Sequence, residues 1–257
     1  MSRTSCISDI THLPCFKLLC CAEQRAAFDA IRECRRAADT SRPNIFLINA
    51  TAGTGKSFLC RALLSDAMAE GDITCAAASS GIAAQILPRG RTGHSAFGIP
   101  VPTEEDSTSS ITAESSRGKY LQEVKLIVWD EAATHGRSVY ECMDRLLIDL
   151  MQKVNTCYMA GKVVVFVADF RQCLPIVHRG TEGTKLASCI TNCRFWPSVR
   201  ILNLTVNERV RQRLLQLGNE SAEAQRSMAY ADWLLDVGEG LVPHVQVQII
   251  FVYLSCI

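Results

Sequence analysis

Apolar residues in this chain fall into short continuous runs that alternate with longer stretches of helical spacing. The continuous runs predict buried strands at residues 45–48, 73–78, 124–129, 162–168 and 199–206. Helical spacing predicts helices at residues 22–38, 58–68, 138–153 and 221–236, with a short helix over 79–88. Continuous apolar strands separated by helices are typical of a parallel sheet that is covered on both faces. We therefore predict an α/β fold.

The remaining segments carry weaker signals. Residues 1–21 show no clear period and are expected to form an atypical lead-in, whereas residues 22–240 hold the predicted strands and helices. Residues 90–102 and 103–118 are expected to be loops, and the second of these is rich in Ser, Thr and Glu. Residues 241–257 turn abruptly apolar, and a final strand there would leave its edge uncovered. We expect this tail to mark a truncation.

Composition narrows the class of protein. The chain has 257 residues, of which 48% are hydrophobic and 21% charged, as expected of a globular domain. Its net charge is +1, so a surface for nucleic acid must be local. Its 13 cysteines include no C-x-x-C pair, which favours reduced thiols over zinc or disulfides. No apolar stretch is long enough to span a membrane, and the first residues lack the features of a secretory signal.

The most specific motif follows the first predicted strand. Residues 49–57 read NATAGTGKS and lead directly into a helix. Small residues let backbone N–H groups surround a phosphate, and the start of the helix adds positive partial charge. The predicted phosphate-binding residues are Ala52, Gly53, Thr54, Gly55, Lys56 and Ser57. Lys56 would reach the β- and γ-phosphates, and the Ser57 hydroxyl would ligate Mg²⁺. An ordinary Gly-rich turn is disfavoured, because a strand and a helix flank the motif.

Other polar residues follow the later strands. Asp130 and Glu131 follow the strand at 124–129, Gln172 follows the one at 162–168, and Arg209 follows the last. Because ligands bind beyond the carboxyl ends of parallel strands, we expect these residues to converge with the phosphate loop.

Phosphoryl transfer requires positioning and charge neutralisation, and each of these residues suits one part of it. Asp130 suits an outer-sphere contact to Mg²⁺, and Glu131 is placed to polarise the attacking water as a general base. The Gln172 amide can contact both the γ-phosphate and the water. Arg209 carries a guanidinium that can stabilise the transferred phosphoryl group. From the residues alone, a plain loop position for Gln172 and a solvated Arg209 stay open.

Two further candidates lie outside the strand ends. Gln24 precedes the first helix, where its amide can donate to and accept from an adenine edge, although a solvated glutamine is the default. Arg91, Thr92, His94 and Phe97 combine charge, hydroxyl and aromatic groups, which suits single-stranded nucleic acid. A core position for Phe97 is an equal alternative.

Together these motifs resemble DNA helicases of superfamily 1, specifically the Pif (petite integration frequency) family and its transposon-encoded Helitron relatives. The matching segments, in order, are residues 22–24 with 27–29, 52–57, 80–84 with 90–95, 129–132, 169–172 with 174–175, and 204–207 followed by Arg209. The resemblance implies a RecA-like P-loop NTPase domain, with a mostly parallel sheet and helices on both faces. It also implies an Mg²⁺-dependent, ATP-driven enzyme that moves 5′-to-3′ on single-stranded DNA in repair, recombination and telomere maintenance.

The same resemblance assigns roles to individual residues. It makes Gln24 the adenine reader, Gln172 the γ-phosphate sensor and Arg209 an arginine finger. It places residues 91–97 in the track for single-stranded DNA. A nuclear location is implied, with a mitochondrial one left open, and the oligomeric state is not indicated.

Some positions depart from the family pattern. Ala50 and Ala168 replace glycines, Ala133 replaces a proline, Glu208 replaces a methionine beside the arginine finger, and Cys21 replaces an asparagine. The larger departure is the family's second motor domain, which has no recognisable counterpart in this sequence. ATP is hydrolysed in the cleft between the two domains of such motors. Our hypothesis is that this chain binds ATP, hydrolyses it poorly and does not translocate.

Two alternatives to a working helicase remain. One is a non-catalytic module that binds ATP and single-stranded DNA, the remnant of a truncated helicase or transposon gene. The other is a small-molecule kinase, which is disfavoured because such an enzyme has no reason to carry the motif at 169–172 or Arg209.

Overall fold

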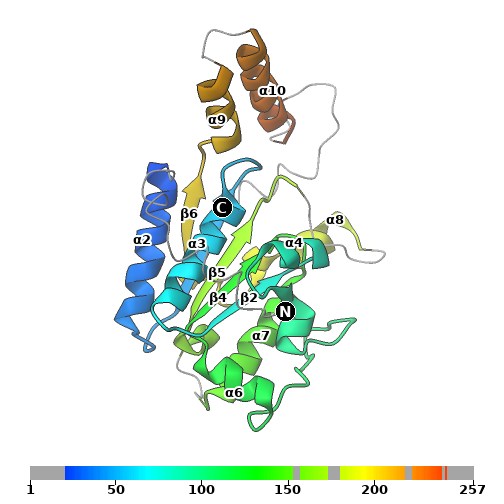
Figure 1. Cartoon of the computed structure of the whole chain (residues 1–257). Helices are drawn as coiled ribbons and strands as arrows, with labels where there is room; N and C mark the ends of the chain where they lie inside the picture. The colour runs from blue at the N-terminus through cyan, green and yellow to red at the C-terminus, as the bar shows by residue number, and fades with distance from the viewer. Residues whose placement is uncertain (1–20, 153–156, 173–179, 218–221, 239–240, 242–257) are drawn as a thin grey trace, which may run out of the picture.

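The fold is built on one parallel sheet (Figure 1). The computed structural model describes residues 21–152, 157–172, 180–217, 222–238 and 241. Within them, the strands are β1 (Asn44–Ala50), β2 (Thr74–Ala78), β3 (Arg91–Thr92), β4 (Leu126–Asp130), β5 (Val163–Ala168) and β6 (Val199–Leu204). Their order is β3-β2-β4-β5-β1-β6, and each neighbouring pair is parallel. All five predicted strands are confirmed, and β3 is an addition.

The helices alternate with these strands. They are α2 (Ala22–Ala37), α3 (Lys56–Ala69), α4 (Gly81–Ile86), α5 (Gly93–Phe97), α6 (Ser116–Glu123), α7 (Arg137–Leu150), α8 (Glu182–Ala187), α9 (Glu208–Leu217) and α10 (Ala222–Gly238). Short 3-10 turns lie at Tyr158–Gly161, Ile190–Asn192 and Trp196–Ser198. The loop expected at 90–102 is wrong in part, because it contains β3 and α5. Both are too short to show a period, so the sequence pattern missed them.

Both faces of the sheet are buried, as predicted. Along β1, Phe46 and Ile48 pack under α2, α3 and α4, whereas Ile45 and Leu47 pack on the side of α5 and α7. All four are fully buried, as is Trp129 of β4. Strand side chains that alternate between two apolar layers explain why these strands read as continuous apolar runs.

The strand ends are aligned at one edge of the sheet. Asn49 of β1 pairs with Ala168 of β5 and with Asn203 of β6, and Ala78 of β2 pairs with Asp130 of β4. The loops that follow these strands therefore begin at similar heights, where polar residues can meet. Helices α9 and α10 follow β6 beyond this edge and pack against each other (Figure 1).

Two predicted segments lie outside the described residues: most of the lead-in at 1–21 and, apart from residue 241, the apolar tail at 241–257. Within the described part of the chain, no helix combines the length and apolar character needed to cross a membrane.

Candidate nucleotide-binding site

The loop between β1 and α3 has the backbone shape of a phosphate cradle. Gly53 and Gly55 adopt φ angles of +85° and +86°, in the left-handed region that favours glycine. A Cβ atom at Gly53 would lie 2.5 Å from Asn207 Oδ1, and one at Gly55 would lie 2.3 Å from Gln24 Nε2. The positive φ angles therefore favour glycine at both positions, and a larger residue would also displace the tips of the Asn207 and Gln24 side chains. Helix α3 begins at Lys56, directly after the loop.

One side chain and one backbone N–H hold this loop from outside. Gln24 is only 2% exposed, and its Nε2 donates to the Thr54 carbonyl at 2.6 Å. On the other side, the Arg209 backbone N–H donates to the Gly53 carbonyl at 3.1 Å. Asn207 Oδ1 accepts from the Val210 N–H at 3.2 Å, so Asn207 caps the start of α9. The loop is thus braced by α2 and by the β6–α9 junction.

The geometry of Gln24 differs from the predicted adenine reader. The amide donor is engaged with the phosphate loop, and Gln24 is not among the described residues that line the cleft. Adenine reading by Gln24 stays a prediction. Gln24 and Thr54 are 30 residues apart in the sequence, so the sequence pattern could not reveal their contact.

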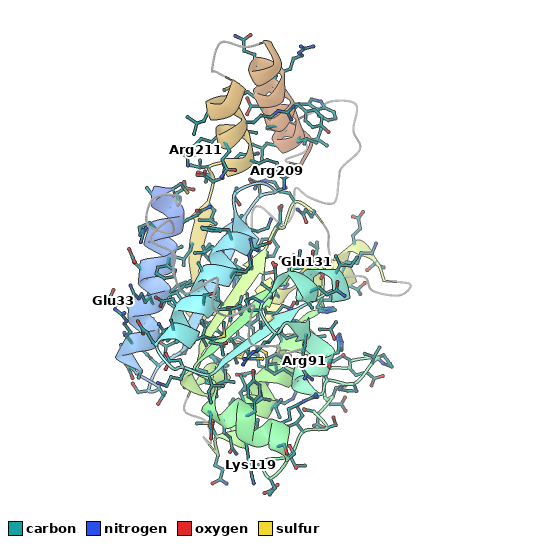
Figure 2. All side chains as sticks on the ribbon, viewed as in Figure 1. Glu33, Arg91, Lys119, Glu131, Arg209 and Arg211 are labelled. Atoms are coloured by element: carbon teal, nitrogen blue, oxygen red, sulfur yellow. The ribbon has the colours of Figure 1, made fainter. Side chains whose placement is uncertain are left out.

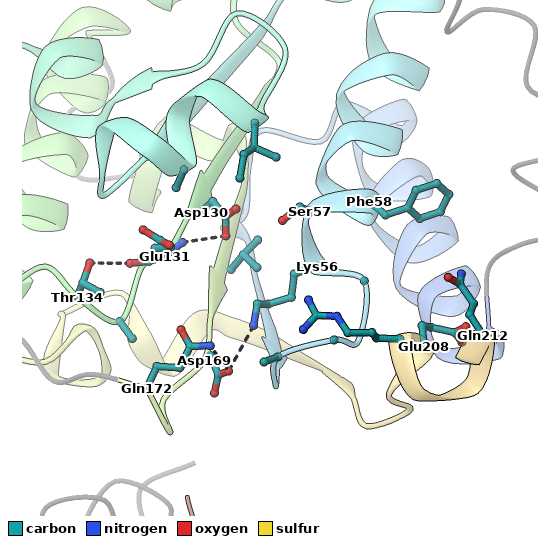
Figure 3. A pocket seen from close by; sticks show the side chains of 18 residues that line it. Lys56, Ser57, Phe58, Asp130, Glu131, Thr134, Asp169, Gln172, Glu208 and Gln212 are labelled. Atoms are coloured by element: carbon teal, nitrogen blue, oxygen red, sulfur yellow. Dashed lines mark hydrogen bonds and ion pairs between the residues drawn. The ribbon is translucent and has the colours of Figure 1, made fainter. Parts of the chain in front are cut away.

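A cleft of about 560 Å³ opens over the carboxyl edge of the sheet (Figure 3). Most of the predicted nucleotide-site residues line it: Ala52, Gly53, Gly55, Lys56, Ser57, Asp130, Glu131, Gln172 and Arg209. Thr54 is instead buried, with its hydroxyl donating to the Thr51 carbonyl at 2.8 Å. The predicted convergence of the strand ends is confirmed.

Lys56 and Gln172 meet at a buried carboxylate. Lys56 Nζ lies 2.9 Å from the Ala50 carbonyl oxygen and 3.4 Å from Asp169 Oδ2. Gln172 Nε2 donates to the same Asp169 oxygen at 2.8 Å (Figure 3). The Asp169 side chain is 6% exposed, so its negative charge sits in a low-dielectric setting and orients both partners. The sequence analysis included Asp169 in the motif at 169–172 but gave it no role of its own.

Asp130 and Ser57 supply the oxygen atoms that suit a divalent cation. Burial raises the pKa of the Asp130 carboxyl, an effect opposed by the hydrogen bond that it accepts from the Glu131 N–H at 2.9 Å. Asp130 and Ser57 both line the cleft, and oxygen donors of this kind fit Mg²⁺. Among the described residues no cluster of three His, Cys, Asp or Glu could hold a metal by itself. This agrees with Mg²⁺ sites that use one or two protein groups together with phosphate and water.

Glu131 is held in an unusual backbone conformation at the mouth of the cleft. Its φ angle is +58°, which is strained for a non-glycine residue. Its carbonyl accepts hydrogen bonds from the hydroxyls of Ser79 at 2.8 Å and Thr134 at 2.9 Å. Its carboxylate accepts from the Ser80 hydroxyl at 2.8 Å. Sequence pattern missed these three hydroxyl donors as parts of the site.

Arg209 and the unusual Glu208 both lie at the start of α9 and line the cleft, where Figure 3 labels Glu208. Arg209 is exposed, as a residue that reaches a ligand would be. Glu208 is 6% exposed, and its Oε2 accepts from Arg211 Nε at 2.8 Å. The anion that replaces the family's methionine is thus paired with Arg211.

The four predicted DNA-contacting residues occupy different environments. Arg91 is exposed on β3, whereas Thr92 and His94 are half-buried. Phe97 is fully buried and stacks on Trp129, with ring centroids 5.6 Å apart. The prediction that Phe97 contacts DNA is wrong for this structure, because its ring lies inside the core. None of the four is among the described residues that line the nucleotide cleft.

A parallel sheet with a glycine loop after its first strand and polar residues at its carboxyl edge defines a P-loop NTPase domain of RecA type. A family model for PIF1-like helicases matches residues 19–248. The chain therefore belongs to the PIF1-like helicase family. A comparison with curated proteins gives no match.

Several solved Pif1 structures share the fold. Pif1 from Bacteroides in complex with ADP-AlF3 and single-stranded DNA is 23% identical, with a TM-score of 0.58 over 72% of this chain and 42% of that one. Unliganded Pif1 from Bacteroides sp. is 21% identical, with a TM-score of 0.56 over 80% and 47%. Pif1 from Candida albicans is 18% identical, with a TM-score of 0.55 over 80% and 46%. This chain thus covers less than half the length of these relatives.

Proposed function

We propose that this chain binds Mg²⁺ and ATP in its cleft and hydrolyses the ATP when single-stranded DNA is bound, as the first motor domain of a DNA helicase. The observation that carries the proposal is the convergence on one cleft of Lys56, Asp130, Glu131, Gln172 and Arg209, which come from four separate strand ends. These residues supply the cation, carboxylate and amide groups that phosphoryl transfer requires.

The arrangement supports a division of roles. The start of α3 and Lys56 neutralise the phosphates, and a triphosphate competes with Asp169 for the Lys56 ammonium. Ser57 and Asp130 would hold Mg²⁺, which would supply positive charge to neutralise the phosphates. Glu131 orients and deprotonates the attacking water. Gln172 donates to the same Asp169 oxygen that faces Lys56. When a phosphate draws the Lys56 ammonium away from Asp169, the position of the Gln172 amide changes with it. Arg209 stabilises charge on the transferred phosphoryl group.

Single-stranded DNA is the proposed partner. The supporting facts are membership of the PIF1-like helicase family and the crystal structure of Bacteroides Pif1 bound to single-stranded DNA. Exposed Arg91 is the candidate phosphate contact, with Thr92 and His94 beside it. Movement in the 5′-to-3′ direction, action in repair, recombination and telomere maintenance, and a nuclear or mitochondrial location remain proposals drawn from the family resemblance.

The test is ATP hydrolysis at saturating Mg²⁺, with and without an oligothymidine strand. We expect a rate that DNA stimulates and that Lys56→Ala abolishes. Lys119→Ala is the matched control, because Lys119 is exposed on α6, away from the cleft (Figure 2). ATP binding without hydrolysis above the Lys56→Ala level would instead mark the chain as a non-catalytic binding module.

A further inference from the structure

The segment that runs from the end of β2 through α5 contacts the Glu131 region at three places, the first being the Ser79 hydroxyl, which donates to the Glu131 carbonyl. We call residues 79–97 the bridge segment and residues 131–136 the Glu131 loop. Ser80 of the bridge segment donates its hydroxyl proton to Glu131 Oε2 at 2.8 Å. At the other end, the ring of His94 packs edge-on against the ring of His135, with centroids 4.8 Å apart. The bridge segment and the Glu131 loop are therefore in direct contact, so a movement of one displaces the other.

The Ser80 hydroxyl is fixed by helix α4. Ser80 is the N-cap of that helix, and its Oγ accepts from the Ala83 N–H at 3.2 Å. The hydroxyl thus accepts from α4 while it donates to Glu131. Ala83 and Ile86 of the same helix line the nucleotide cleft. A shift at the start of α4 would move the hydroxyl and the cleft wall together.

The other bonds to Glu131 leave only its side chain free to turn. Its carbonyl accepts from two hydroxyls, its N–H is bound to Asp130, and its φ angle is +58°. A carboxylate on a fixed backbone points where its hydrogen-bond partner directs it. While Oε2 accepts from Ser80, that oxygen has less capacity to take a proton from water.

The bridge segment also carries the exposed residue proposed to contact DNA. Arg91 lies on the edge strand β3, between α4 and α5 in the chain. Arg91 thus lies between the contacts made by Ser79 and Ser80 and the contact made by His94, so DNA bound to Arg91 would pull on the segment between them. The path from Arg91 to the Glu131 carboxylate therefore runs through α4 and Ser80.

We propose that Ser80 is a positioning residue, which holds the Glu131 carboxylate in a resting orientation and releases it when single-stranded DNA engages the bridge segment. The inference rests on the proposed function and adds its regulation: hydrolysis is slow without DNA because the general base is held by Ser80.

The first test compares ATP hydrolysis of Ser80→Ala with that of the unaltered protein, with and without oligothymidine. The rate without DNA should rise about fivefold, the factor that corresponds to one net hydrogen bond, while the rate with DNA should change little. Ser80→Thr keeps the hydroxyl and should restore the low rate without DNA. Ser115→Ala is the matched control, because Ser115 also caps a helix, α6, and its hydroxyl bonds to Gly118 and Thr112 instead of Glu131.

The second test needs no hydrolysis. If DNA must break the Ser80–Glu131 bond, Ser80→Ala should bind a labelled oligothymidine about fivefold more tightly, as measured by fluorescence anisotropy. In a Glu131→Ala background the same substitution should have no effect, because the bond is already lost.

Three results would overturn the inference. A Ser80→Ala variant with unaltered rates and unaltered DNA affinity would do so while leaving the proposed function intact. A proportional fall in both rates would do so too, since Ser80 would then hold Glu131 in its working orientation. If the unaltered protein neither binds oligothymidine nor hydrolyses ATP, the proposed function fails and the inference fails with it.

Discussion

The substitution Gly55→Ala tests the shape of the phosphate loop. At φ +86° an alanine costs about 1–2 kcal/mol in backbone strain. Its Cβ would also lie 2.3 Å from Gln24 Nε2, so the buried amide must turn away from the Thr54 carbonyl. Loss of that hydrogen bond costs about 1 kcal/mol more. We therefore expect the free energy of unfolding to fall by about 2–3 kcal/mol.

Gly71→Ala is the matched control. Gly71 has a φ of +81°, and a Cβ there would meet nothing within 4 Å. It should lose only the strain of about 1–2 kcal/mol. Urea unfolding followed by circular dichroism measures both variants. The difference between them isolates the contact with Gln24.

A double-mutant cycle completes this test. In a Gln24→Ala background the clash at Gly55 disappears, so Gly55→Ala should cost about 1 kcal/mol less than in the unaltered protein. Strictly additive costs, or a Gly55→Ala variant no less stable than Gly71→Ala, would refute the claim that Gln24 braces the loop.

Three other substitutions test the core, the histidine pair and a buried ion pair. Phe97→Ala should lower the free energy of unfolding by about 3–5 kcal/mol in urea titrations, since the ring is fully buried against Trp129; a loss below 1 kcal/mol would contradict a core position. Burial, and then the charge of His94, lower the pKa of His135 to about 4, below the unfolded value of about 6.5. The unfolded chain therefore binds the proton first, and stability that is present above pH 6.5 is lost as the pH falls toward 4. In His135→Asn this loss should be smaller by about 1–2 kcal/mol, which is less than the full pKa shift would give because His135 is partly exposed. A pH profile of urea unfolding equal to that of the unaltered protein would contradict this. The Arg35 side chain is 2% exposed and pairs with three carboxylates of α3 and the loop after it. Arg35→Ala should therefore lower the free energy of unfolding in urea by about 3 kcal/mol, whereas Arg36→Ala, at a half-exposed side chain, should lower it by less than about 1 kcal/mol. Equal losses would contradict the claim that burial strengthens the Arg35 ion pairs.

The strands and the phosphate loop could be predicted because their signals are local. A strand such as β5 is buried on both faces, so nearly every residue in it is apolar. The phosphate loop needs small residues, with glycines of positive φ at fixed positions. Gly53 and Gly55 stand at those positions, so the loop can be recognised from the sequence alone. Parallel strands then bring their ends together, which is why Glu131, Gln172 and Arg209 could be expected to meet.

Other features depend on contacts between residues that are distant in the sequence. Ser80 looks like an ordinary helix cap, and its second partner Glu131 lies 51 residues further along. Phe97 reads equally well as a stacking residue or as core, because the direction of its ring is set by packing on Trp129. Gly93 must also be small, since a Cβ there would lie 2.1 Å from the Trp129 ring, but this contact too is visible only in the structure.

Helices α6 and α9 were missed for a different reason. Helix α6 carries few apolar residues and begins at a serine cap, so its period is weak. Helix α9 is rich in charged and polar residues, and most of its described side chains are exposed or only partly buried. Amphipathic periodicity is a weak guide where a helix has little core to face.

The central claim is that the cleft binds Mg²⁺ and ATP through Lys56. The most direct test is calorimetric titration of ATP with Mg²⁺ into the unaltered protein, Lys56→Ala and Lys119→Ala. We predict one saturable site per chain, unchanged in Lys119→Ala and at least about tenfold weaker in Lys56→Ala, because a charge-assisted contact worth about 1.5 kcal/mol or more is removed. Equal affinities for all three proteins, or no saturable binding to the unaltered chain, would contradict the claim.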